Sequence, residues 1–285
     1  SMKLSALPED ISQRVLVYCP PKSGKTEAMG KLAETHELIW IDLEDGIKTL
    51  LTLPPELQEK VDVIQIPESK ANPVAINTLL KLVTWIPGSV CVEHGIWDCA
   101  ACKKNGLPVT EVNLRQKDWS KTIIVVDSLS ALAESAMNHI MRSRDATAKP
   151  EWDDYAAQGG LISKFLSAVQ TSRMNWMMAT HEMEVEREDG TMVLVPVSGT
   201  RNFSRNTSKY FDHVVYMRVK GGRHTAGSAT TYLDKVNTGS RLGVKVEGSQ
   251  EIDLRPFFNK ELRQAAIAQK AEAAKNTVQA AKQSL

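Results

Sequence analysis

Six apolar runs of strand length, separated by segments with helical spacing, constrain the fold of this chain more than any other feature. The runs are rich in β-branched residues and read "RVLVYC" 14–19, "LIWIDL" 38–43, "VDVIQI" 61–66, "TIIVVD" 122–127, "NWMMAT" 175–180 and "HVVYMRV" 213–219. Segments with helical spacing lie between them, at 26–36, 73–86, 130–142 and 159–172. Nearly continuous apolar strands that alternate with helices are typical of a sheet covered on both faces. The sequence therefore predicts an α/β fold with a mostly parallel central sheet flanked by helices.

Three regions interrupt this alternation. Residues 87–121 form an irregular insert that holds three of the four cysteines, and 184–197 is typical of a β-hairpin that turns at Asp189 and Gly190. The Ala-rich end is prone to form a helix. We therefore expect one domain over 1–255, containing the insert, followed by a helical tail over 256–285.

Composition limits the classes of protein to which the chain can belong. Its 285 residues are 42% hydrophobic and 24% charged, with a net charge of +1, so overall charge gives no argument for a nucleic-acid or membrane partner. The first residues lack the apolar core of a signal peptide, and no apolar run reaches the length of a membrane span. Four cysteines in a chain of this size do not suggest a disulfide scaffold. We expect a soluble, intracellular protein without a membrane partner.

The segment "CPPKSGKT", residues 19–26, lies between a predicted strand and a predicted helix. This is the context of a phosphate-binding loop, in which backbone amides at a helix N-terminus surround the phosphates of a nucleotide. Lys25 would contact the β- and γ-phosphates, and the Thr26 hydroxyl would bind Mg²⁺. Cys19 replaces the usual first glycine, which is acceptable where φ is negative. The expected nucleotide-binding residues are Pro21, Lys22, Ser23, Gly24, Lys25 and Thr26.

Asp127 ends an apolar strand, at the sheet edge where open α/β sheets bind their ligands. There its carboxylate can hold Mg²⁺ opposite Thr26. The alternative is an acid that caps the next helix, although Ser128 or Ser130 could take that role.

A second group of acids, Asp42, Glu44 and Asp45, lies at the end of the strand at 38–43. A carboxylate at this edge can act as the base that activates water for attack on a γ-phosphate, and we choose Glu44 for that role. The alternative is a surface turn, because "EDG" is also good turn chemistry.

The chain resembles the RecA-like ATPases, and in particular phage nucleotide-binding proteins that include single-strand annealing recombinases. The resemblance extends over about 14–245 and rests on "PPKSGKT", "WIDLEDG", "IIVVDSLSAL", 152–182 and 195–219. It implies ATP and Mg²⁺ as cofactors and a catalytic group of Lys25, Glu44, Asp127 and His181. His181 would sense the γ-phosphate and signal its state to a DNA-binding loop. Glutamine is common at this position, and a purely structural histidine is the alternative.

Positive charge is concentrated in residues 199–245, where nine basic residues face two acidic ones for a net charge of +7. Within this segment "SGTRNFSRNTSK" is predicted to be a loop that binds single-stranded DNA through Arg201, Phe203 and Arg205. The alternative is a solvated loop with a buried Phe203. The resemblance also implies a ring or filament in which a neighbour's basic residue reaches the γ-phosphate, for which Lys235 and Arg241 are the candidates.

The insert contains "CVEHGIWDCAAC", which gives one Cys-x2-His pair and one Cys-x2-Cys pair. Such pairs suit tetrahedral Zn²⁺, so Cys91, His94, Cys99 and Cys102 are candidate ligands of a compact structural zinc knuckle. The alternative is three reduced thiols beside a surface histidine.

The leading hypothesis is an ATP-dependent recombination protein that binds single-stranded DNA and pairs or anneals strands as an oligomer. A RecA-type helicase or a replication accessory ATPase is the second hypothesis, and a nucleotide-binding module with little turnover is the third. Glu44 and Asp127 argue against the third, because a protein that only binds nucleotide needs no water-activating base. Expected partners are single-stranded DNA, further copies of this chain and a single-strand-binding protein, in the cytoplasm of a bacterial host if a phage encodes the chain.

Overall fold

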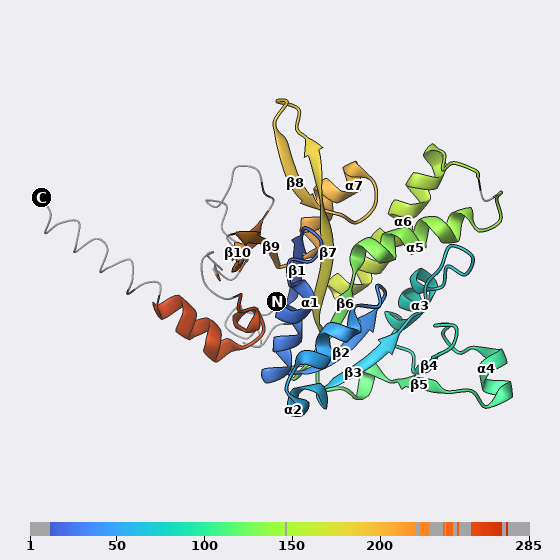
Figure 1. Ribbon diagram of the computed structural model, residues 1–285, viewed down its shortest axis with the longest axis horizontal. Coiled ribbons are helices and arrows are strands. Elements are labelled where there is room, and N and C mark those ends of the chain that lie inside the picture. Colours follow the sequence, from blue (N-terminus) through green and yellow to red (C-terminus); the bar gives the residue numbers. More distant parts are fainter. Residues whose placement is uncertain are drawn as a thin grey trace, which may run out of the picture.

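The computed structural model describes residues 12–145, 147–220, 223–227, 236, 238–241, 244, 252–269 and 272, without the side chains of 220 and 223–227. A twisted sheet forms the centre of the molecule, in the order β10-β9-β1-β7-β6-β2-β3 (Figure 1). From β9 to β3 all neighbouring strands are parallel, whereas β10 pairs antiparallel with β9. The bounds of these strands are Arg14–Cys19 (β1), Glu37–Asp42 (β2), Val61–Gln65 (β3), Thr122–Asp127 (β6), Asn175–Glu186 (β7), His213–Lys220 (β9) and Arg223–Gly227 (β10). The predicted mostly parallel sheet is confirmed.

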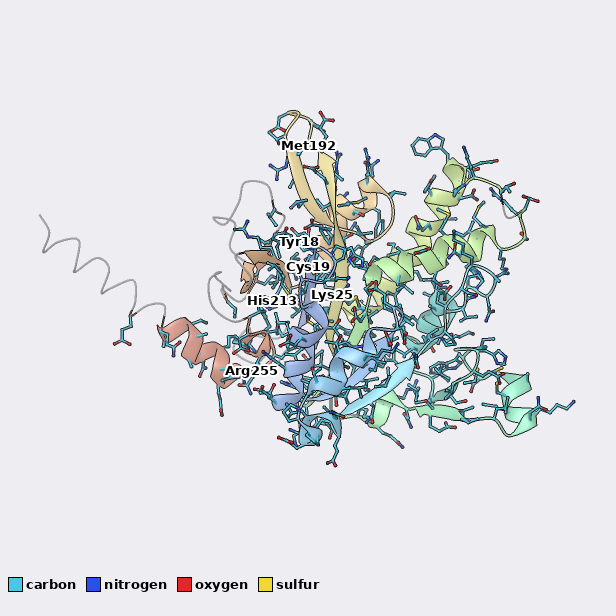
Figure 2. All side chains as sticks on the ribbon, viewed as in Figure 1. Tyr18, Cys19, Lys25, Met192, His213 and Arg255 are labelled. Carbon is cyan, nitrogen blue, oxygen red and sulfur yellow. The ribbon has the colours of Figure 1, made fainter. Side chains whose placement is uncertain are left out.

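Strand β7 is six residues longer than predicted because its second half leaves the sheet. From Glu182 to Glu186 it pairs antiparallel with β8 (Met192–Pro196), which confirms the predicted hairpin. This hairpin projects from the sheet in Figure 1, and Met192 lies toward its tip in Figure 2. The short strand β11 (Gly239–Ser240) pairs with the amino end of β9.

Both faces of the sheet are covered, as the apolar strands require. In β1, Leu16 and Tyr18 belong to one core, and Val15, Val17 and Cys19 belong to the other. The first core packs under α3 (Ala75–Leu82), α5 (Leu129–Met141) and α6 (Trp152–Thr171). The second packs against α1 (Lys25–Gly30), the 3₁₀ helices η2 (Lys31–Glu34) and η3 (Gly46–Thr52), and the segment that follows Ile252. Burying a large apolar side chain contributes about 1.5–3 kcal/mol, so these two cores hold the strands in register.

The cysteine-containing insert folds beside the main sheet rather than remaining irregular. It contains a two-stranded sheet and a short helix. The elements are β4 (Gly88–Cys91), α4 (Ala100–Asn105), β5 (Val109–Val112) and the 3₁₀ helix η4 (Leu114–Gln116). In Figure 1 it extends from the β3 side of the sheet.

The described core continues past residue 255. Phe257, in the 3₁₀ helix η7 (Arg255–Phe257), is fully buried, and Phe258 is nearly so. Residues 260–269 are helical, and most of the predicted tail beyond them lies outside the described residues. No helix within the described ranges is long and apolar enough to cross a membrane. The remaining short helices are α2 (Pro55–Gln58), α7 (Arg201–Asn206) and the 3₁₀ helix η5 (Thr207–Tyr210).

Candidate functional site

The loop between β1 and α1 has the backbone shape that an anion-binding turn requires. Lys22 and Gly24 adopt positive φ, at 61° and 81°. Gly24 caps α1 without a side-chain hydrogen bond, so the first amides of the helix point toward the space above the loop. Cys19 is not among the residues with positive φ, so this turn does not need glycine there. Burial raises the pKa of the Cys19 thiol to about 11, which keeps it uncharged below the loop.

Thr26 and Asp127 meet at the carboxyl edge of the sheet. The Thr26 hydroxyl donates to Oδ2 of Asp127 at 2.9 Å. Asp42 stands beside Asp127 in the register of β2 and β6, and both carboxylates are 1% exposed. The second oxygens, Oδ1 of Asp127 and Oδ2 of Asp42, are buried without a hydrogen-bond partner. Burial raises the pKa of Asp127 to about 6, with a smaller increase from the Glu44 and Asp42 charges and opposing effects from Lys25 and Thr26.

A buried carboxylate with a free oxygen is a suitable place for a cation, because an unpaired buried charge is costly. The surroundings leave room for one. A Cβ built on Gly46 would lie 3.5 Å from Oδ2 of Asp127 and 3.9 Å from the Thr26 hydroxyl oxygen. These residues therefore fit a magnesium site. The capping role that was the alternative for Asp127 belongs to Ser128, whose side chain accepts from the amide of Ala131.

Of the three acids at the end of β2 and in the turn after it, Glu44 is the one that reaches the loop. Its Oε2 lies 3.3 Å from Nζ of Lys25, and its Oε1 accepts a hydrogen bond from Ser128. Burial alone would raise the pKa of Glu44, but the hydrogen bond from Ser128 and the charges of Lys25 and His181 more than offset this effect, and the net pKa is lowered. Glu44 is thus ionised at neutral pH and able to accept a proton.

The other two acids serve the turn itself. Oδ1 of Asp42 accepts from the amides of Glu44 and Gly46, at 3.2 and 3.1 Å. Asp45 adopts φ 55° and pairs with Lys48, a largely exposed lysine. The turn interpretation therefore fits Asp42 and Asp45, while Glu44 points into the site.

His181 lies where β7 leaves the sheet. It stands opposite Cys19 in the register of β7 and β1, and its Nε2 is 3.5 Å from Oε1 of Glu44. Its Nδ1 is buried without a hydrogen-bond partner. Burial and the Lys25 charge lower the pKa of His181, against an opposing effect of Glu44. The structure thus brings Lys25, Thr26, Glu44, Asp127 and His181 together; Figure 2 labels Cys19 and Lys25 at the start of this site.

The segment predicted as a DNA-binding loop is partly a helix. Thr200 caps α7 by accepting from the amide of Phe203. The Phe203 ring is half-buried and stacks on Tyr210, with ring centroids 6.3 Å apart. Arg205 donates to the carbonyl oxygen of Glu186, the last residue of β7. Arg201 is exposed at the first turn of α7.

An exposed aromatic pair beside Arg201 was not identified from the sequence. Trp152 is 87% exposed and Tyr155 is 40% exposed, both in the first turn of α6. Together with Arg201 and Asn202 they line a cavity of about 410 Å³. Glu151 and Asp154 form a capping box that starts α6 at residue 152 rather than 159. This pair of acids was the sequence signal that could have placed Trp152 and Tyr155 in the first turn of a helix.

Of the two basic residues predicted to reach a neighbouring subunit's γ-phosphate, the structure describes one. Lys235 lies outside the described residues. Arg241 pairs with Asp212 at 3.2 Å, and its backbone amide donates to the Asp212 carbonyl. Asp212 precedes β9, so Arg241 lies at the amino edge of the sheet, opposite to the phosphate-binding loop of its own chain.

The four metal-ligand candidates of the insert converge. The four candidate ligand atoms of Cys91, His94, Cys99 and Cys102 lie within 4.8 Å of one another. Nδ1 of His94 is 3.2 Å from Sγ of Cys102, 3.9 Å from Sγ of Cys91 and 4.0 Å from Sγ of Cys99. Tetrahedral zinc, with bonds of about 2.3 Å to sulfur, places its ligands roughly 3.5–3.8 Å apart. The residues therefore fit a closed four-ligand zinc site.

Comparison with known proteins identifies the type of domain. The family described as AAA domain matches residues 11–242. Among solved structures, the chain is similar to the flagellar accessory protein FlaH from Methanocaldococcus jannaschii, with 14% identity and a TM-score of 0.40 over 85% of this chain and 91% of that one. No curated protein matches the sequence significantly. The chain therefore belongs to the AAA domain family of P-loop ATPase domains.

Proposed function

We propose that the protein is an ATP-dependent recombination protein of the RecA-like phage type, which binds single-stranded DNA and anneals or pairs strands as a ring or filament. One observation carries the ATPase part of the proposal. Lys25, Thr26, Glu44 and Asp127 come from three segments of the chain and meet at one edge of the sheet, within 3.3 Å of a partner in the group. A site that only binds a nucleotide, without hydrolysing it, does not need an ionised base beside the lysine.

Each residue of the group has a part in hydrolysis. The amides of 22–26 and the Lys25 ammonium would hold the β- and γ-phosphates. Thr26 and Asp127 would hold Mg²⁺, which neutralises phosphate charge when it is bound. Glu44 would accept the proton of the attacking water, and the hydrogen bond from Ser128 fixes the direction of its carboxylate.

The site has a short physical connection to the DNA-binding candidates. The β7 arm runs from His181 to Glu186, and Arg205 of α7 donates to the Glu186 carbonyl. At the start of the arm, the Tyr216 hydroxyl donates to Oε2 of Glu182 at 2.8 Å. A shift of His181 on nucleotide binding would therefore move the arm and α7, which carries Arg201.

DNA binding itself is proposed from chemistry at the same end of the molecule. The exposed rings of Trp152 and Tyr155 offer stacking surfaces, and Arg201 offers a charge for the backbone. Aromatic and basic side chains in one groove are the combination that single strands bind, with about 1–3 kcal/mol for each stacked base. A single-strand-binding protein would then compete for, or deliver, the same DNA.

We also propose that the insert holds a structural zinc ion on Cys91, His94, Cys99 and Cys102. Gly95, which follows the candidate ligand His94, contacts the main domain: the Thr78 hydroxyl of α3 donates to the Gly95 carbonyl at 2.7 Å. A Cβ on Gly95 would lie 2.7 Å from Cγ2 of Ile66, so the turn packs tightly against the end of β3. Zinc would brace this contact rather than take part in hydrolysis, because four protein ligands leave no open coordination position.

Binding of labelled single-stranded DNA, followed by anisotropy with and without a non-hydrolysable ATP analogue, tests the proposal. Trp152→Ala and Arg201→Ala should each weaken binding roughly tenfold, and the analogue should change the affinity of the wild type. Lys164→Ala is the matched control, since Lys164 is exposed on the same helix as Trp152 and does not line the cavity. Wild-type DNA affinity in both Trp152→Ala and Arg201→Ala would contradict the DNA site. If the analogue did not change the DNA affinity of the wild type, the result would favour a nucleotide-binding module over an ATPase that is coupled to DNA binding.

A further inference from the structure

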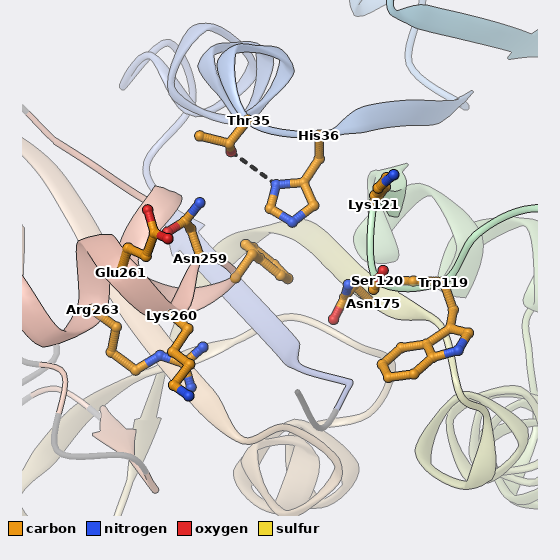
Figure 3. A pocket seen from close by; sticks show the side chains of 11 residues that line it. Thr35, His36, Trp119, Ser120, Lys121, Asn175, Asn259, Lys260, Glu261 and Arg263 are labelled. Carbon is orange, nitrogen blue, oxygen red and sulfur yellow. Dashed lines mark hydrogen bonds between the residues drawn. The ribbon is translucent and has the colours of Figure 1, made fainter. Parts of the chain in front are cut away.

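Two adjoining cavities lie at the amino edge of the sheet and share Trp119. The first, of about 420 Å³, lies between the starts of β2 and β6 and helical residues 260–263 (Figure 3). The second, of about 340 Å³, lies between Trp85, the segment 114–119 and residues 171–174. Both are at the opposite end of the strands from the phosphate-binding loop. Six residues of β6 separate the two edges, which is about 20 Å at the usual rise of a strand.

The charged side chains that line both cavities are mostly basic. Lys121, Lys260 and Arg263 line the first, and Arg115, Lys117 and Arg173 line the second. Glu261 is the acidic residue among the lining residues. Lys117 pairs with Asp62 at 2.9 Å and Lys121 with Asp118 at 3.8 Å. Since both acids are more than half exposed, these pairs are weak, and a phosphate could replace the carboxylates at little cost.

Flat apolar surfaces lie between these charges. Trp119 and Trp85 are half-buried and pack against the core, which fixes their rings. Asn175 also donates to the Trp119 carbonyl at 2.9 Å and so anchors its backbone. In Figure 3, Trp119 and Lys121 lie on one side of the first cavity, and Lys260 and Arg263 on the other.

We propose that the two cavities form a second binding track for single-stranded nucleic acid, with bases against Trp119 and Trp85 and phosphates on the six basic side chains. Ordered aromatic rings between basic side chains are typical of surfaces that bind single strands without sequence preference. The track goes beyond the proposed function, because it lies at the other edge of the sheet and uses none of the same residues. It would give an annealing protein a separate place for its second strand.

Photocrosslinking with an oligonucleotide that carries 5-iodo-deoxyuridine tests the track. The label reacts with aromatic side chains near bases, and trypsin releases Trp119 in the peptide Asp118–Lys121, because Lys117 precedes it. We expect the wild type to give crosslinks in this peptide. Wild-type protein that crosslinks elsewhere but never in this peptide would overturn the proposal.

A charge-reversal variant adds a quantitative test. Arg115→Glu combined with Arg173→Glu should lower the Trp119 crosslink yield at least fivefold, while Lys164→Glu should leave it unchanged; all three positions are exposed. The double variant should still crosslink at Trp152, and its ATPase should still respond to DNA. An unchanged Trp119 yield would contradict the track. If thymidine monophosphate competed as well as an oligonucleotide of equal base concentration, the cavities would be a site for free nucleotide, and the proposal would also fail.

The same data separate this inference from the proposed function. Trp119 crosslinks without any Trp152 crosslink or DNA-stimulated ATPase would overturn the proposed function and leave the track standing. Trp152 crosslinks and DNA-stimulated ATPase without Trp119 crosslinks would overturn the track and leave the proposed function standing.

Discussion

The Nε2 atom of His181 lies 3.5 Å from Oε1 of Glu44, at the residue where β7 leaves the central sheet. One side of the imidazole therefore faces the proposed base, and the chain beyond it forms the arm that reaches Arg205. Hydrolysis and DNA binding would be coupled through this histidine. A glutamine at this position could also donate to an anionic oxygen.

Replacing His181 should uncouple the two activities. In His181→Ala, the ratio of ATPase rates with and without single-stranded DNA should fall toward one, because no donor remains to pass the state of the phosphates to the arm. His181→Gln should recover part of the stimulation, since its amide is a donor. The measurement is phosphate release at saturating ATP over a DNA titration. Stimulation of wild-type size in the alanine variant would show that His181 is structural.

Gly46 provides a test of the magnesium site without altering a ligand. In Gly46→Ala, the new methyl group would lie 3.5 Å from Oδ2 of Asp127, in the space that Mg²⁺ and its waters would use. The Mg²⁺ concentration that supports half-maximal ATPase should rise roughly tenfold, which corresponds to about 1.4 kcal/mol.

The matched control is Gly160→Ala in α6, where a Cβ meets no atom within 4 Å. This variant should keep wild-type magnesium dependence and gain about 0.5–1 kcal/mol of stability. Equal magnesium dependence in both variants would place the cation elsewhere.

Zinc should be recoverable from purified protein at one ion per chain. Cys102→Ser should lower this stoichiometry and the melting temperature, because removing a ligand would open the site that is proposed to brace the turn at Gly95. Cys19→Ser should keep the zinc, because Cys19 belongs to the core under the phosphate-binding loop. Metal-free protein that melts at the same temperature as the zinc-loaded form would contradict the site.

His213 should make folding stability depend on pH. Burial lowers its pKa from 6.5 to about 4, and neutral His213 contacts Gln13 and Ser240 through its two ring nitrogens. Asp212 opposes this shift, while Arg263 and Arg241 add to it. Between pH 6.5 and 4 the unfolded chain binds more protons than the folded one, so the free energy of unfolding decreases as the pH falls through this window.

The size of the effect is about 3 kcal/mol, and chemical denaturation at several pH values measures it. His213→Gln keeps a polar side chain without the titration, so its stability should vary less between pH 6.5 and 4 than that of the wild type. Parallel curves for the two proteins would contradict the assignment to His213.

The sequence was sufficient to predict the sheet and the meeting of Thr26, Glu44 and Asp127 at its edge, because both depend on local patterns. The run at 14–19 and the run at 122–127 match β1 and β6 residue for residue. Parallel strands bring their carboxyl ends to one edge, so Thr26, Glu44 and Asp127 could be expected to meet. The roles of these residues in catalysis remain predictions.

Other features depend on side-chain contacts that composition and spacing do not show, and could not be predicted in the same way. The polar composition of 198–209 favoured a loop, but capping by Thr200 and stacking of Phe203 on Tyr210 make part of it a helix. The amino-edge cavities combine Trp119, Arg173 and Arg263, which no spacing in the sequence relates to one another.

The most direct measurement of the central claim is the steady-state ATPase rate of the wild type and Glu44→Gln, with and without single-stranded DNA, at low and high salt. The account predicts DNA stimulation in the wild type that falls as salt rises, and at least a hundredfold lower rate in Glu44→Gln with ATP binding retained. Full turnover in Glu44→Gln, or a wild-type rate that does not respond to DNA at low salt, would contradict it.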